Sequence, residues 1–129
     1  MLGDLIGESR GKRLVRRALP DGKAEISFED AGTLLGQKGS GFGTYVAEVR
    51  PDGSIYGEGQ GVFMTAKGEM ARWKGMGVGK FVGAGVSYRG ALSYQSNGPK
   101  LSRLNSIAVI FEYETDDAGN THSKLWEWK

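Results

Sequence analysis

The chain has 129 residues, with 17 basic and 15 acidic side chains, a net charge of +2, 22 glycines and no cysteine. Glycine stands at more than twice its usual share of about 7% without a three-residue period, which excludes collagen and argues against a helical protein. The lack of cysteine excludes disulfides, thiol nucleophiles and thiolate metal sites. The length fits one domain. We therefore expect a single all-β domain over residues 1–129.

The longest fully apolar run, residues 107–111, is far shorter than the roughly 20 residues that a membrane-spanning helix needs. The first residues also lack the apolar core of a signal peptide. We therefore expect a cytoplasmic protein that makes no use of a membrane.

Turn signals separate segments rich in β-branched and aromatic residues. They are Asp-Gly, Asp-Ala-Gly, Lys-Gly and Gly-Ala. Three-residue loops are predicted at residues 20–22, 30–32, 51–53 and 117–119, and two-residue loops at 67–68 and 83–84. The predicted strands lie near residues 12–19, 23–30, 33–50, 54–66, 69–82, 85–95, 105–115 and 121–129. The third is too long to be straight, so we expect it to bend or break between Gly36 and Gly43. Only residues 96–104 form a long connection, in which we expect a helical turn.

Glycines recur at alternate positions in three groups, eighteen residues apart. They are Gly39, Gly41 and Gly43, then Gly57, Gly59 and Gly61, then Gly75, Gly77 and Gly79. Alternate residues share one face of a strand. The pattern indicates one hairpin arm per period, with glycines that let a strongly curved sheet close.

Hairpin register predicts which face of this sheet is inside, because directly opposed residues share a face. Pairing around the loops at 51–53, 67–68 and 83–84 collects large apolar side chains on one face. They are Phe42, Val46, Val62, Met64, Trp73, Phe81, Val86, Tyr88, Leu92 and Tyr94. The other face carries Arg72, Lys74, Lys80 and Arg89. The apolar face is therefore predicted to be the interior.

Glu58 and Gln60 fall on this predicted interior face. Residues opposite Glu58 along the row are Gly77 and Gly90, so the register predicts a hollow with a carboxylate at its edge. Such a carboxyl group suits proton transfer or hydrogen bonding. Arg16, the one predicted inward cation, could instead pair with it. A third possibility is a structural glutamate satisfied by tyrosine hydroxyls and Gln60.

Glu58 is thus the candidate catalytic residue. The candidate ligand-binding residues are Tyr56, Gln60, Trp73, Gly77, Tyr88, Gly90, Tyr94 and Arg16.

Basic residues cluster near the N-terminus between Arg10 and Arg17. Register places Arg17 opposite Glu25 and Arg13 opposite Glu29, which predicts cross-strand ion pairs on a solvated face. With so small a net charge and no aromatic stripe, we expect no nucleic-acid partner.

His122 is the only histidine, so a multi-histidine metal site is impossible and we expect no metal. Register places His122 opposite Glu114, which predicts a surface pair. In the same hairpin Trp126 and Trp128 share the face opposite the core. Outward tryptophans predict a partner surface, whose simplest use is a homo-oligomer.

Residues 54–92, and above all the run Gly75-Met76-Gly77-Val78-Gly79-Lys80-Phe81-Val82-Gly83-Ala84, resemble allene oxide cyclase-type barrels and related small calycin-like proteins. The resemblance covers about a third of the chain. It implies an eight-stranded antiparallel up-and-down barrel with a central apolar cavity, in a superfamily that includes cofactor-free cyclases and often forms oligomers.

Together these observations predict a barrel that binds a small, mostly apolar or amphipathic molecule inside and needs no cofactor. As an enzyme it would be a cyclase or isomerase in which Glu58 transfers or polarises a proton. The alternatives are a non-catalytic carrier or sensor, and an assembly module with a filled barrel. A ligand site predicts a void of a few hundred Å3 around Gly77 and Gly90.

Overall fold

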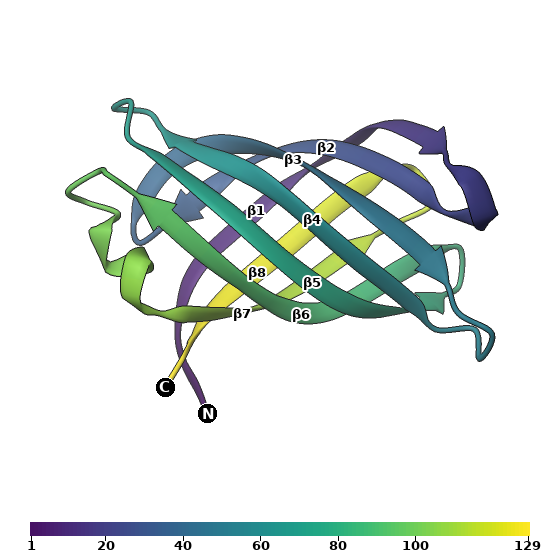
Figure 1. Cartoon of the computed structure of the whole chain (residues 1–129). Coiled ribbons are helices and arrows are strands. Elements are labelled where there is room, and N and C mark those ends of the chain that lie inside the picture. Colours follow the sequence, from purple (N-terminus) through teal and green to yellow (C-terminus); the bar gives the residue numbers. More distant parts are fainter.

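Eight antiparallel strands, joined in sequence by hairpins, form a sheet whose first and last strands pair, so that it closes into a barrel (Figure 1). The computed structural model describes residues 1–129. The strands are β1 (Leu2–Ala18), β2 (Ala24–Leu34), β3 (Gln37–Val49), β4 (Ile55–Thr65), β5 (Met70–Val82), β6 (Gly85–Ser96), β7 (Ala108–Thr115) and β8 (Asn120–Trp128). Two 3-10 helices, η1 (Pro20–Gly22) and η2 (Ser102–Ser106), lie between strands. The predicted eight-stranded antiparallel barrel is confirmed.

The first hairpins differ from the sequence prediction. β1 begins at Leu2, well before the expected start near residue 12, and pairs with both β2 and β8. The predicted loop at 30–32 is wrong, because Asp30 stays in β2 opposite Gly41. The chain turns instead at Leu35 and Gly36, which both have positive φ angles. Two consecutive residues of this kind match the twist of the flanking strands, so the expected break in the third segment falls at Gly36.

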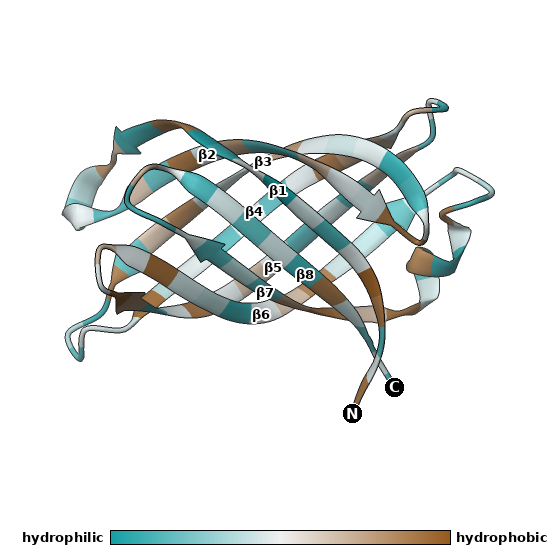
Figure 2. Cartoon of the chain, turned by 180° about the vertical axis from the view of Figure 1, so that it is seen from behind, coloured by the Kyte–Doolittle hydropathy of each residue, from teal (hydrophilic) through white to brown (hydrophobic).

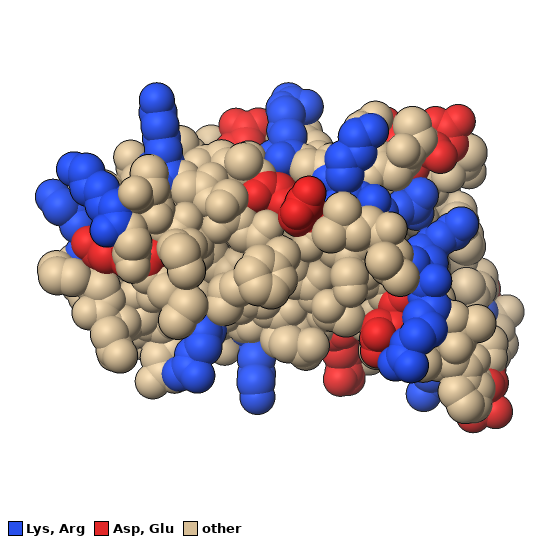
Figure 3. Space-filling model, turned by 90° about the horizontal axis from the view of Figure 1, so that it is seen from above, with Lys and Arg blue, Asp and Glu red and all other residues tan.

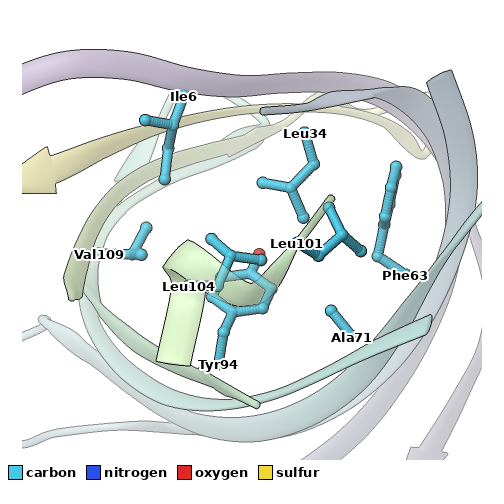
Figure 4. Close-up of a cluster of buried hydrophobic side chains, with 8 residues drawn as sticks. All are labelled: Ile6, Leu34, Phe63, Ala71, Tyr94, Leu101, Leu104 and Val109. Atoms are coloured by element: carbon cyan, nitrogen blue, oxygen red, sulfur yellow. The ribbon is translucent and has the colours of Figure 1, made fainter. Parts of the chain in front are cut away.

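One end of the barrel is closed by the connection between β6 and β7. Leu101 and Leu104, at and within η2, are fully buried. Figure 4 shows them directed between the strands toward Tyr94. They complete a core of Ile6, Leu34, Phe63, Ala71, Tyr94, Leu101, Leu104 and Val109. The second core lies toward the other end and contains Ile26, Ala47, Ile55, Tyr88 and Tyr113.

The turn between β4 and β5 decides which residues face inward. Thr65 and Glu69 are joined by a backbone hydrogen bond of 2.8 Å, so the loop has three residues rather than two. Gly68, which has a positive φ angle, closes it. Gly57 therefore opposes Gly77, where Glu58 was predicted to do so. Because side chains alternate, a shift of one residue turns every side chain of a strand to the other face.

The predicted pairings on either side of this turn are correct. Val46 opposes Glu58 and Gly77 opposes Gly90, as the register predicts. The interior assignment is therefore wrong for β3 and β4 and correct for β6 and most of β5, where Phe81 near the end of the strand is exposed. Side chains on β3 and β4 that were predicted inside but lie outside are Phe42, Val46, Tyr56, Glu58, Gln60, Val62 and Met64.

The three glycine groups line the inside of β3, β4 and β5, where aromatic rings occupy the space above most of them. A Cβ atom at Gly61 would come within 2.5 Å of Trp73, and one at Gly43 within 2.7 Å of the same ring. Such approaches leave no room for a side chain. The repeat thus supplies room for large rings in a narrow barrel, in addition to the predicted curvature.

Hydrophilic and hydrophobic residues alternate along the strands, as Figure 2 shows, because successive side chains of a strand point to opposite faces. In the view of Figure 3, basic side chains are interspersed with acidic ones. The two ends of the chain lie side by side (Figure 1), and the Met1 and Lys129 backbones exchange hydrogen bonds of 2.7 and 2.8 Å. The only helices are two short 3-10 turns, neither long enough to cross a bilayer.

Candidate functional site

A cavity of about 110 Å3 lies inside the barrel, between the two cores. Side chains from all eight strands reach it, most of them aromatic or aliphatic. The inward side chains around it are Ser9, Phe28, Asp30, Leu34, Tyr45, Phe63, Trp73, Tyr88, Leu92, Tyr94, Phe111, Tyr113, Ser123 and Leu125. It is an apolar chamber with a few polar groups, which is the usual composition of a small-molecule site.

Asp30 is the one carboxylic acid directed into this chamber. It follows Ile26 and Phe28 at alternate positions of β2, so strand geometry places it on the inner face. Ser9 donates a hydrogen bond of 3.2 Å to its Oδ2 atom, and the Ser9 and Ser123 hydroxyls lie 2.8 Å apart. Burial raises the pKa of Asp30 to about 6, with the Ser9 hydrogen bond acting in the opposite direction. The group can therefore exchange a proton near neutral pH.

Tyrosine hydroxyls are the other polar groups of the chamber. The Tyr113 hydroxyl is buried and forms no hydrogen bond. Tyr45 is near enough to help raise the pKa of Tyr113, after burial as the main cause. Burial is the main cause of the raised pKa of both Tyr94 and Tyr113, and the charge of Asp30 adds to it in both. These phenols stay protonated and can donate hydrogen bonds. An unpaired buried hydroxyl costs about 1–3 kcal/mol, so a ligand atom that accepted from Tyr113 would recover this energy.

The aromatic walls are held together by ring contacts. Phe28 stacks on Trp73 with ring centroids 6.3 Å apart, and it meets Tyr113 at 5.4 Å. Tyr45 lies edge-on to both Tyr88 and Tyr113, at 5.8 and 5.9 Å. Packing of this kind fixes the shape of the chamber.

The predicted inward orientation of Glu58 is wrong. Its side chain is exposed, and it accepts a hydrogen bond of 2.6 Å from Tyr56 on the outer face of β4. The guanidinium of Arg50 lies over the Tyr56 ring, 4.7 Å from its centroid. Gln60, also outward, is exposed. The cause is the one-residue difference in the loop between β4 and β5, which turns the side chains of Glu58, Tyr56 and Gln60 outward, although Glu58 is among the residues that border the cavity.

The predicted hollow beside Gly77 and Gly90 is only partly present. The Phe111 ring comes within 2.7 Å of a Cβ placed at Gly90, which does not line the cavity, and within 2.9 Å of one at Gly77, which does. The open space extends toward Asp30. Trp73, Tyr88 and Tyr94, by contrast, line the cavity on the inner faces of β5 and β6.

The N-terminal basic cluster divides between the two faces of β1. Arg17 pairs with Glu25 at 3.1 Å, as predicted. A bulge between Arg13 and Val15 shifts the register, so Arg13 opposes the inward Phe28 rather than Glu29. Arg16 opposes Ile26 but is exposed, and no carboxylate pairs with it.

His122 opposes Glu114 as predicted, but its ring bonds elsewhere. The Nε2 atom lies 2.6 Å from the Glu8 carboxylate on β1. This hydrogen bond is the main reason that the pKa of Glu8 is lowered. No three His, Cys, Asp or Glu side chains gather as they would around a metal ion. Trp126 opposes Ile110 on the outer face, and Trp128 is exposed.

Sequence reasoning missed Asp30, Ser9, Ser123 and Tyr113. Asp30 was assigned to a loop because Asp-Ala-Gly is a turn signal. Its alternation with Ile26 and Phe28 was the signal that could have found it, since that pattern continues to the buried Leu34.

No protein-family model matches the chain, and no curated protein matches it in sequence. Solved structures match over nearly its whole length. A protein of unknown function from Clostridium acetobutylicum superposes with a TM-score of 0.86 at 11% identity, covering 98% of this chain and 99% of that one. A β-barrel-like protein from Acinetobacter baumannii gives 0.78 at 12%, covering 100% and 96%.

An enzyme from Penicillium herquei also matches, with a TM-score of 0.69 at 12% identity over 96% of this chain and 92% of that one. Identities this low show the fold alone. The barrel implied by the family resemblance is therefore confirmed, while the likeness to allene oxide cyclases in particular stays a prediction.

Proposed function

We propose that the chain binds a small, mostly apolar molecule inside its barrel, oriented by Asp30 and the tyrosine hydroxyls. The observation that carries this proposal is a cavity of about 110 Å3 that holds a buried carboxyl group and, in Tyr113, a buried hydroxyl with no partner. A chamber that served packing alone would be filled or wholly apolar.

The volume limits the ligand. At about 110 Å3, the cavity is smaller than the sequence predicted and smaller than drug-sized sites, but it approaches the size of apolar cavities that accept benzene. We therefore propose a ligand body of about one ring, with a polar atom that faces Asp30. Trp73, Tyr88 and Tyr94 supply its walls.

Filling the cavity tests the binding proposal. Ser123 points inward beside Ser9, so Ser123→Leu places a branched side chain in the open space. Ser40→Leu on the exposed face of β3 is the matched control. We expect p-cresol to bind the unaltered chain and the control by calorimetry, and to bind Ser123→Leu at least tenfold more weakly. Equal binding to all three would show that the probe sits elsewhere.

A cofactor-free isomerase or cyclase is the second candidate, and Asp30 favours it. A carboxyl group with a pKa of about 6 suits general acid–base catalysis near neutral pH. Asp30 takes the role that the sequence suggested for Glu58. The Penicillium herquei protein supports the idea that this fold accommodates catalysis, and the allene oxide cyclase resemblance points to the same class.

Mass spectrometry of a metabolite extract incubated with the protein separates this enzyme from a carrier or sensor. An enzyme converts a molecule from the extract, Asp30→Asn loses the conversion, and the outward Glu58→Gln retains it. A carrier returns the same unaltered molecule from all three proteins. If nothing is retained, the remaining candidate is an assembly module that works through its outer face.

A further inference from the structure

Arg13 is placed on the inner face of the barrel by a local irregularity in β1. Ser9, Gly11 and Arg13 alternate along the strand and oppose Gly32, Asp30 and Phe28 of β2. Without the bulge that follows Arg13, the register from η1 would put Arg13 outside, opposite Glu29. Bulges commonly redirect a side chain at the rim of a barrel. The bulge thus turns one arginine of a basic strand toward the tyrosine end of the cavity.

No carboxylate pairs with the Arg13 side chain. Its side chain lies against the buried Gly119, with Nε 3.8 Å from a Cβ placed there. Arg13 is the strand partner of Phe28, whose ring lies 6.1 Å from that of Tyr45 and 5.4 Å from that of Tyr113, centroid to centroid. Burial raises the pKa of Tyr45 and Tyr88, and the charge of Arg13 opposes this in both. The two rings belong to the wall of the cavity. Arg13 itself does not line the cavity, but it lies on the inner face of β1 beside Phe28, which does.

Arg13 differs from the arginines that form ion pairs in both its exposure and its partners. Arg17, Arg89 and Arg103 each pair with a glutamate, and all three are more exposed than Arg13. Arg13 is the least exposed of the four, and it forms neither an ion pair nor a side-chain hydrogen bond. Partial removal of a guanidinium from water is unfavourable unless an anion or acceptor compensates for it.

We propose that Arg13 binds the carboxylate of the molecule inside the barrel, so that the ligand is a small cyclic or aromatic monocarboxylic acid. This inference rests on the proposed internal site. The ring lies in the chamber, the carboxylate meets Arg13, and the Tyr45 and Tyr88 hydroxyls donate to the same oxygens. A planar guanidinium suits a carboxylate, and a single cation with neutral donors suits one negative charge.

Asp30 lies apart from Arg13 on the inner face. It bonds to Ser9, beside Ser123, whereas Arg13 opposes Phe28, two residues before Asp30 on the inner face of β2. The proposal therefore gives the ligand a cationic contact at Arg13 and a carboxyl contact at Asp30, at successive inward positions of the β1–β2 pair. A ligand with its carboxylate at one end and a neutral polar atom at the other satisfies both.

Calorimetry with benzoate and its neutral analogue benzamide tests the proposal. We expect the unaltered protein at pH 7.5 to bind benzoate about tenfold more tightly than benzamide, with the difference shrinking in high salt. Arg13→Gln should remove the preference and keep benzamide binding, whereas Arg13→Lys should keep part of it. Arg10→Gln, exposed on the same strand, is the matched control and should leave the preference intact.

Equal affinity for the two probes, or a preference that survives Arg13→Gln, overturns the role of Arg13 and leaves the internal site standing. If neither probe binds the unaltered protein while p-cresol does, the carboxylate assignment is wrong. If no probe of this size binds, the internal site itself is wrong. Retention of benzamide binding by Arg13→Gln shows that this variant is folded.

Discussion

Replacing Asp30 with asparagine should change how the stability of the barrel depends on pH. Burial raises the pKa of this carboxyl from 3.8 to about 6, so the folded chain keeps the proton to a higher pH than the unfolded chain. The contribution to the free energy of unfolding is therefore fully present below about pH 4 and lost as pH rises through about 6. At about 1.4 kcal/mol per pKa unit the loss is about 3 kcal/mol, and water reaching the half-buried group reduces this to between about 1 and 3 kcal/mol.

Asparagine imitates the neutral acid, so Asp30→Asn should be insensitive to this titration. Urea unfolding at pH 4 and pH 8 measures the difference. We expect the variant and the unaltered chain to be similar at pH 4, and the variant to be more stable by about 1–3 kcal/mol at pH 8. The exposed Asp117→Asn serves as a control and should show no such divergence. If Asp30→Asn is equally or less stable at pH 8, Asp30 is ionised and well paired in the folded chain, and its proposed role as a proton donor fails.

Three further predictions concern packing and assembly. Gly61→Ala would bring a Cβ within 2.5 Å of Trp73. We expect this overpacking to cost about 1–3 kcal/mol in urea unfolding, and an unchanged midpoint would contradict the ring-over-glycine packing. Leu104→Ala removes a fully buried side chain from the closed end. It should cost about 2–5 kcal/mol, whereas a negligible cost would mean that η2 is not part of the core. Trp128 lies exposed beside Leu2. We expect light scattering to find an oligomer that Trp128→Ser converts to monomer. A monomeric unaltered chain would refute a role for Trp128 in oligomer formation.

Sequence by itself determined the architecture of this protein. Six turn signals, five of them at the right place, and alternating apolar residues were enough for eight antiparallel strands, because both depend on local backbone preferences. The Arg17–Glu25 pair and the outward Trp126 followed from counting residues away from short hairpins. Such counting works within one hairpin as far as the first bulge, because up to that point loop length determines the pairing.

The inner and outer faces across hairpins were decided by tertiary structure. The sequence around residues 66–68 is compatible with a loop of two or of three residues. The three-residue loop that forms turns Glu58 outward and the glycines of β4 inward. The three-residue loop is favoured by the whole barrel, because only then does Trp73 lie over Gly43 and Gly61, which have no side chains.

The functional residues show the same division. Trp73, Tyr88 and Tyr94 were placed at the cavity from the register of a single hairpin, β5 to β6. Asp30 and Arg13 were not predicted to face inward. Asp30 was assigned to a loop because Asp-Ala-Gly is a turn signal, and Arg13 is turned inward by a bulge that the sequence did not indicate. Local propensities define strands and turns, but the burial of a charge depends on closure of the sheet, which brings β1 against the far end of the chain in β8.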